Sequence, residues 1–285
     1  MRHHLTVDVE EFFHSTLLTE RIPEHAWGSY PRRAPVVVPW ILERLAEADA
    51  RATFFVLGWT AERDPDVVRE IHRAGHEVAA HSWRHRRVDT LDPETFRDAV
   101  RRCKNLLEDI TGEAVSGYRA PSFSITPGKE WAFDVLLDEG FTYDSSIYPI
   151  DHGPAYGYPG GHPDPHVLLR GARTLVEVPI LSLRVAGRRW PAAGGAYLRL
   201  LPLSLVRSAL RQTERRGVPG TLYIHPWDID PDLDPVRVPP LLHWRLFGGA
   251  ARARRRLAGL IEAFPSACIR DTVKRLSSDP TTAPT

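Results

Sequence analysis

Residues 52–57, Ala-Thr-Phe-Phe-Val-Leu, form an apolar run rich in β-branched and aromatic side chains. Such a run is typical of a strand that is buried on both faces of a parallel sheet. Segments with a helical period of apolar residues occur before and after it along the chain. The clearest of them is 92–110. The same alternation continues along the chain. It predicts strands at 5–9, 52–57, 77–81, 116–119, 141–144, 175–181, 221–225 and 268–272.

Helices are expected between these strands, at 36–48, 64–75, 92–110, 126–140, 203–216 and 250–263. Strands that alternate with helices, without an internal sequence repeat, favour a parallel α/β sheet. We expect a single-domain, distorted (β/α) barrel with about seven to eight strands. An open, doubly wound sheet is the alternative, but no glycine-rich phosphate loop supports it.

Two segments do not fit this alternation. Residues 145–171 are rich in Gly, Pro and His, so they are expected to form either a loop over the functional site or a disordered stretch. Residues 277–285 are expected to be a disordered tail. The folded domain is therefore predicted to span residues 1–276.

The overall charge is nearly balanced, with 37 Lys and Arg against 36 Asp and Glu. No global field attracts the chain to nucleic acid or to anionic lipid, and the arginines near 252–256 are expected to form the solvated face of a helix. Acidic residues precede any apolar run of signal-peptide length, and no stretch of 18 apolar residues occurs. The default expectation is a soluble, cytoplasmic protein without a transmembrane segment.

A pair of histidines, His81 and His85, follows the predicted strand at 77–81. Both imidazoles could face one metal ion if the segment makes a single helical turn. Two other pairs have the same spacing, but a glycine interrupts the pair at 72 and 76, and prolines interrupt the pair at 162 and 166. The alternative for His81 and His85 is that both are ordinary surface histidines.

Carboxylates follow the first predicted strand. Alternation places Asp8 and Glu10 on one face of that strand and Val9 on the other. A carboxylate with two neutral imidazoles is a competent ligand set for a divalent ion, and the second carboxylate could accept a proton from water. These acids could equally mark a solvated strand end.

Two further polar residues stand at predicted strand ends. Arg119 could hold a carboxylate by a bidentate contact or pair with a surface acid. His225 could protonate a leaving amine, although a lone histidine in such a place is more often a satisfied core residue. The convergence of several strand ends favours the functional interpretation of both.

In these segments the chain resembles the polysaccharide deacetylases, a family of metal-dependent carbohydrate esterases with a chitooligosaccharide deacetylase-like domain. The motifs are Thr-Val-Asp-Val-Glu at 6–10, His-Ser-Trp-Arg-His at 81–85, Arg-Ala-Pro at 119–121 and Ile-His-Pro at 224–226. Residues 194–199 and 225–228 are similar to an exopolysaccharide-associated, in part exosortase-linked, subgroup.

The resemblance implies a role for each matching residue. Asp8 would be the general base, His81 and His85 metal ligands, Arg119 the residue that orients the base, and His225 the general acid. Val9 stands where the family's usual motif has a second, metal-binding Asp. Alternation favours Glu10 as the replacement ligand, because Glu11 would point away if the strand continues. Ser122 stands where an aromatic residue usually follows the proline.

The implied activity is metal-dependent removal of N-acetyl groups from an amino-sugar polymer, oligomer or precursor, within exopolysaccharide biosynthesis. Zn is the favoured ion, and Co, Ni or Fe would suit the same ligands. An amidohydrolase acting on a cyclic imide or ureide, and a non-catalytic metal-binding or glycan-binding relative, remain alternatives. Tyr118, Trp83, Trp227 and Tyr148 are candidates to stack on sugar rings or, equally, to pack in the core. The sequence does not fix the oligomeric state.

Overall fold

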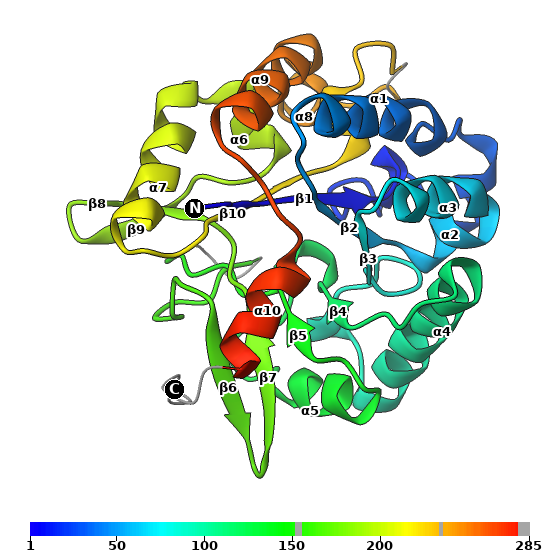
Figure 1. The fold of residues 1–285 in the computed structure, drawn as a ribbon. Helices are drawn as coiled ribbons and strands as arrows, with labels where there is room; N and C mark the ends of the chain where they lie inside the picture. The colour runs from blue at the N-terminus through cyan, green and yellow to red at the C-terminus, as the bar shows by residue number, and fades with distance from the viewer. Residues whose placement is uncertain (152–155, 234–235, 279–285) are drawn as a thin grey trace.

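The computed structural model describes residues 1–151, 156–233 and 236–278. Its centre is a curled sheet with strand order β10-β1-β2-β3-β4-β5-β7-β6, surrounded by helices (Figure 1). Neighbouring strands in this sheet are parallel except for the antiparallel pair β7 and β6. Their bounds are β1 His4–Val9, β2 Thr53–Val56, β3 Glu77–Ala80, β4 Gly117–Tyr118, β5 Tyr143–Asp144, β6 His166–Arg170, β7 Arg173–Glu177 and β10 Thr221–Ile224.

The predicted distorted (β/α) barrel is confirmed, in the form of a half-barrel. Its eight strands form one sheet whose outermost members are β10 and β6. Because the parallel strands point the same way, their carboxyl ends meet at one edge of the sheet. That edge is where the functional side chains were expected.

The core explains the strand pattern. All residues of β2 are buried, as expected for a strand covered on both faces. In β1, Val7 and Val9 join the main apolar cluster, whereas Thr6 and Asp8 face the concave side, where Arg119 contacts both. Val9 is therefore a core residue, and alternation leaves the acids on the functional side.

Helices fill the connections between strands. Six agree with the predicted segments apart from their ends: α1 Ala34–Glu47, α3 Pro65–Arg73, α4 Pro93–Thr111, α5 Trp131–Asp138, α7 Leu203–Arg215 and α9 Ala250–Ala263. The longest of them, α4, shows how the sequence sets the two ends of a helix. Asp92 caps it by accepting a hydrogen bond from the Thr95 N–H at 2.9 Å, and Gly112 ends it at φ +72°. None of the helices in the described ranges is long and apolar enough to cross a membrane.

One predicted strand is wrong. Residues 269–272 belong to helix α10 (Ile269–Ser278), which packs against β7, and Cys268 directly precedes it. Ile269, Thr272 and Val273 are buried at helical spacing. The segment Cys-Ile-Arg-Asp-Thr is too short for its sequence pattern to decide between strand and helix.

Other elements escaped the sequence pattern. Residues 145–171 are not wholly irregular, because they contain β6, which forms a hairpin with β7. A second hairpin joins β8 (Ser182–Val185) to β9 (Arg188–Pro191), and its polar, exposed residues give little strand signal. Three short helices were also missed: α2 Gly58–Arg63, α6 Gly195–Leu200 and α8 Pro240–Phe247.

The predicted tail is only partly within the described chain. Helix α10 extends to Ser278, two residues into the segment assigned to the tail. Residues 279–285, and residues 152–155 of the predicted loop, lie outside the described ranges.

Candidate active site

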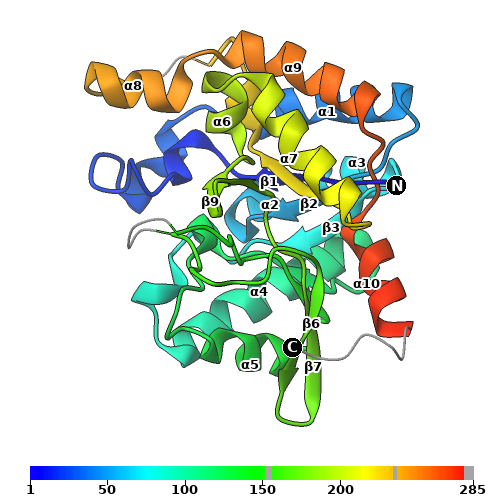
Figure 2. The same cartoon turned by 90° about the vertical axis from the view of Figure 1, so that its left-hand side faces the viewer.

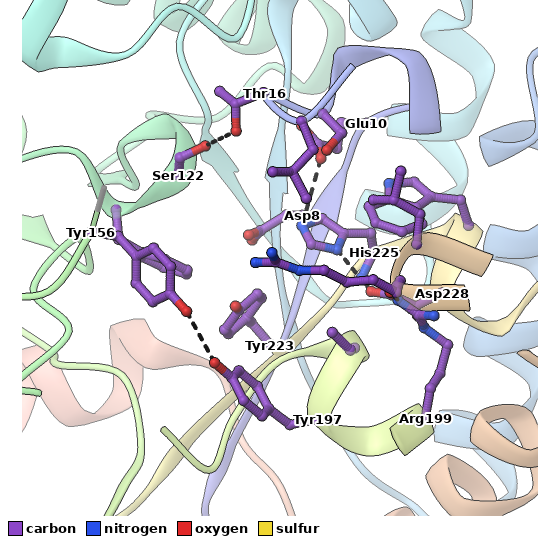
Figure 3. A pocket seen from close by; sticks show the side chains of 18 of the residues that line it. Asp8, Glu10, Thr16, Ser122, Tyr156, Tyr197, Arg199, Tyr223, His225 and Asp228 are labelled. Carbon is purple, nitrogen blue, oxygen red and sulfur yellow. Dashed lines mark hydrogen bonds and ion pairs between the residues drawn. The ribbon is translucent and has the colours of Figure 1, made fainter. Parts of the chain in front are cut away.

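Polar side chains from separate strands meet at the carboxyl edge of the sheet. Asp8 lies in β1, Glu10 follows it, His81 follows β3 and His225 follows β10. All four line a cavity of about 640 Å³. Figure 3 shows Asp8, Glu10 and His225 grouped at its floor. The structure thus brings together residues that are far apart in the sequence.

A tight loop, not a helical turn, pairs His81 with His85. The segment has no helical structure, and Ser82 and His85 have φ values of +64° and +52°. The two ring centroids are 5.3 Å apart. The expectation of a helical turn is therefore wrong, because left-handed residues bend the chain back instead. Non-glycine residues in this conformation are uncommon and gather at functional sites.

Glu10, His81 and His85 form a buried group that fits a metal ion. One ligand atom from each lies within 4.8 Å of the others. Glu10 Oε2 lies 2.7 Å from His85 Nε2, yet this oxygen makes no hydrogen bond within the described chain. His81 Nδ1 donates to the backbone oxygen of Arg119 at 2.8 Å, which leaves Nε2 as the ligand atom. The donor set of one carboxylate and two imidazoles suits Zn and similar divalent ions.

The charge states of these groups agree with such a role. Burial lowers the pKa of His81 to about 4, so its ring is neutral near pH 7. Burial by itself raises the pKa of Glu10, but the imidazoles of His85 and His225 outweigh it and hold the pKa below its ordinary value. The site therefore presents an anionic carboxylate beside a neutral imidazole.

Glu11 serves a different part of the fold. Its carboxylate accepts hydrogen bonds from the backbone N–H of Arg33 at 2.8 Å and of Ala34 at 2.9 Å, at the start of α1. Burial raises the pKa of this carboxyl to about 7. The chain thus turns Glu10 toward the histidines and Glu11 toward a helix N-terminus.

Arg119 is fully buried and holds Asp8. Its guanidinium donates to Asp8 Oδ1 at 2.7 Å and to Thr6 Oγ1 at 2.6 Å. Ser145 accepts two further bonds, and the ring of Phe55 lies 4.0 Å from the guanidinium carbon. A buried charge is stable only with such a complete set of partners. The result is a carboxylate fixed in place at the pocket floor.

His225 is oriented by a carboxylate. Its Nδ1 donates to Asp228 Oδ2 at 2.7 Å, while Nε2 lies 3.5 Å from Glu10 Oε1. Trp227 stacks on the ring, with centroids 4.7 Å apart and planes 10° apart. Burial lowers the pKa of His225, but the Asp228 carboxylate, with Glu10 and Asp8, outweighs this and raises it to about 9. The ring is therefore protonated near pH 7.

Asp228 and Arg199 are functional candidates to which sequence reasoning assigned no role. Arg199 is buried and donates to Asp228 Oδ1 at 3.1 Å and to the backbone oxygens of Gly248 and Arg245. Gly195 lies so close that a Cβ there would be 1.7 Å from Asp228 Oδ2. The sequence offered one signal for this contact. Gly194 and Gly195 allow a close approach of the backbone, and Arg199 is the one charged residue in the otherwise apolar segment that follows.

The four aromatic candidates are placed differently. Trp227 lines the pocket. Tyr118 packs against Phe96, and Trp83 is covered by the Arg102 guanidinium at 3.6 Å. The hydroxyl of Tyr148 donates to the backbone oxygen of Ala193 at 3.2 Å. These three side chains are buried outside the pocket lining.

Other residues form the pocket wall. The hydroxyls of Tyr156 and Tyr197 are 3.0 Å apart across the side opposite Glu10 (Figure 3). Tyr156 belongs to the predicted 145–171 loop, so that segment does reach the site. Ser122 and Phe123 both have positive φ and line the pocket. The aromatic side chain that was expected directly after Pro121 is thus found one position later, at Phe123.

Fold and site together define a barrel-like α/β protein with a candidate metal-dependent hydrolase centre. A sequence model of the polysaccharide deacetylases matches residues 28–132, and one of a domain of unknown function, DUF3473, matches residues 145–274. The structure is similar to that of a Mycobacterium smegmatis protein assigned to the polysaccharide deacetylases, at 25% identity and a TM-score of 0.69. That match covers 100% of this chain and 93% of the other.

Two curated relatives have related names. A peptidoglycan deacetylase of Helicobacter pylori is 31% identical over 42% of this chain, and a peptidoglycan-N-acetylglucosamine deacetylase of Bacillus cereus is 24% identical over 53%. The chain spans 40% and 60% of their lengths. The structure of Puue allantoinase shares the fold, with a TM-score of 0.63 at 16% identity, over 98% of this chain and 91% of that one. Residues 28–132 therefore match a polysaccharide deacetylase domain, and the whole chain is similar in structure to a protein assigned to that family.

Proposed function

We propose that the protein is a metal-dependent hydrolase that removes N-acetyl groups from an amino-sugar polymer or its precursor. The observation that carries the proposal is the convergence of Glu10, His81 and His85 beside Asp8 and His225. The similarity to that family supports the same reaction, because the curated relatives are named as deacetylases.

Each residue has a chemical task in this proposal. Glu10, His81 and His85 would hold a divalent ion, which when bound polarises an amide carbonyl and lowers the pKa of water. Asp8, held by Arg119, accepts the proton of the attacking water. His225, protonated and oriented by Asp228, donates a proton to the departing nitrogen. Zn is the ion we favour, and Co, Ni or Fe fit the same donors.

A panel assay tests the reaction. We expect the metal-loaded protein to release acetate from N-acetylglucosamine oligomers and the Asp8→Asn variant to do so at least about 100-fold more slowly. A cyclic ureide belongs in the panel, because an allantoinase shares the fold. Ring opening without acetate release would assign the chain to the amidohydrolases. Glycan binding without hydrolysis would assign it to the non-catalytic relatives.

The biological setting is a further part of the proposal. We place the reaction in exopolysaccharide biosynthesis, on the resemblance of residues 194–199 and 225–228 to that subgroup, and we expect a cytoplasmic location. Deletion of the gene should leave the secreted polysaccharide with more N-acetyl groups. An unchanged acetyl content would contradict this setting without affecting the assigned reaction.

A further inference from the structure

Helix α8 exposes two large apolar side chains on its outer side. Leu241 is 76% exposed and Trp244 is 55% exposed. The inner side is used for folding, because Leu246 is buried and Phe247 packs against the neighbouring apolar cluster. The exposed pair lies one helical turn apart, so it forms a single apolar patch that the described chain leaves open to solvent.

The same region is positively charged. Every charged side chain in residues 236–261 is an arginine. Arg254 stacks on a tryptophan and Arg256 donates to backbone carbonyls at the end of α6. Arg245, Arg252 and Arg255 are exposed and have no carboxylate partner in the described chain. The arginines near 252–256 therefore carry a local positive charge that no carboxylate of the described chain neutralises by an ion pair.

This surface borders the mouth of the candidate active site. Trp244 and Arg245 line the cavity, as does Leu17, which is 41% exposed. Figure 2 shows α8 protruding at one end of the molecule, with α9 continuing along the same edge. The segment around Leu17 adds Glu20 and Arg21, whose charges cancel. The net character of the surface is apolar and cationic.

We propose that α8 and the first two turns of α9 dock the protein on an anionic lipid bilayer, with the pocket mouth toward the membrane. A helix with Leu and Trp on its outer side can insert at the boundary of headgroups and acyl chains. Unpaired arginines beside it attract anionic headgroups. An acidic glycan would engage the arginines but would not require a largely exposed leucine one turn from a tryptophan, so the bilayer is the partner that uses both features.

Vesicle co-flotation of the full chain tests this surface. We expect binding to phosphatidylcholine vesicles that contain phosphatidylglycerol, weaker binding to phosphatidylcholine alone, and release at high salt. The double variant Leu241→Ser with Trp244→Ser should lose at least about tenfold in partitioning, from the apolar area removed. Arg252→Gln and Arg255→Gln should each lose about fivefold.

A matched control separates this patch from exposed apolar surface in general. Leu169, 55% exposed, and Trp190, 53% exposed, lie on the β6 and β9 strands. Their double serine variant should bind vesicles like the unchanged protein. Absence of vesicle binding, or an equal loss in both double variants, would overturn the proposal. Capture of an acidic oligosaccharide without vesicle binding would also overturn it, in favour of a glycan surface.

Discussion

Two imidazoles at the same edge of the sheet, the buried His81 and the partly buried His225, are held in opposite charge states. His81, in the part that matches the polysaccharide deacetylase model, donates to a neutral backbone carbonyl, and burial lowers its pKa to about 4. His225, in the part that matches DUF3473, donates to the Asp228 carboxylate, which raises its pKa to about 9 against the effect of burial. Burial lowers the pKa of both rings, and the carboxylate beside Nδ1 of His225 outweighs that effect, whereas the carbonyl beside Nδ1 of His81 does not.

This difference assigns the two regions different tasks. A neutral ring can offer a lone pair to a metal ion, whereas a protonated ring can supply a proton. In the proposed reaction the first region would provide the ion-binding histidines, and the second would provide the acid together with Asp228 and Arg199. Neither matched region includes Asp8, which lies on β1 between β10 and β2, or Glu10, which follows β1. The site therefore combines residues at the end of β1 with residues from both matched regions.

Replacing His81 should have the largest effect. His81→Ala removes one of three candidate ligands, so we expect loss of stoichiometric metal and at least about a 10³-fold loss of acetate release. Metal content by mass spectrometry and the acetate assay measure the two effects. Full metal content in this variant would contradict the ligand assignment.

Replacing His225 should separate the two tasks. His225→Gln should retain metal and lower the rate of acetate release by about 10² to 10⁴-fold, because the proton donor is gone while the ligands remain. The matched control is His243→Gln, which changes an exposed histidine on α8. Loss of metal in His225→Gln would place His225 among the ligands and remove the distinction between the two regions.

Removing the partner of His225 should have a smaller effect. Asp228→Asn keeps the size of the side chain but not the charge, so the ring loses its orienting carboxylate. We expect about a 10- to 100-fold loss of rate with metal content unchanged. Asp232→Asn, at an exposed position of the same segment, should leave the rate as it is.

A third buried imidazole gives the smallest expected effect, on stability. His4 contacts Thr221 at 3.0 Å and Thr272 at 2.9 Å, and burial lowers its pKa to about 3. The unfolded chain then binds a proton below about pH 6.5 that the folded chain does not bind until about pH 3. Stability should fall as pH drops through that window, with His4 contributing up to about 1.4 kcal/mol per pH unit. Denaturant unfolding at several pH values gives the free energy of unfolding as a function of pH. This free energy should fall less steeply between about pH 6.5 and pH 3 in His4→Gln than in the unchanged protein. An equal steepness in both would contradict the assignment.

The sequence predicted the strand ends that form the site, but not their local geometry. Alternation in β1 placed Asp8 and Glu10 on one face, because the period of a strand is independent of its partners. The spacing of His81 and His85 was informative, but the positive φ of Ser82 and His85 has no sequence signal comparable to a glycine. Backbone conformation of this kind depends on the surrounding fold.

The network around His225 could not be read from the sequence. Arg199 and Asp228 come from separate elements, and their contact depends on the close approach that Gly195 permits. The strand predicted at 268–272 failed for a related reason. A five-residue segment is too short to establish a period, and the helix is recognised only from the packing of its buried residues against β7.

The central claim is that one divalent ion lies between Glu10, His81 and His85, flanked by Asp8 and His225. Anomalous X-ray diffraction from crystals of the metal-loaded protein tests it most directly, since the absorption edge identifies the ion and the peak locates it. We expect a single peak bonded to a Glu10 carboxylate oxygen and to Nε2 of both histidines. A peak elsewhere, or a bound ion with Glu10 turned away from it, would contradict the account.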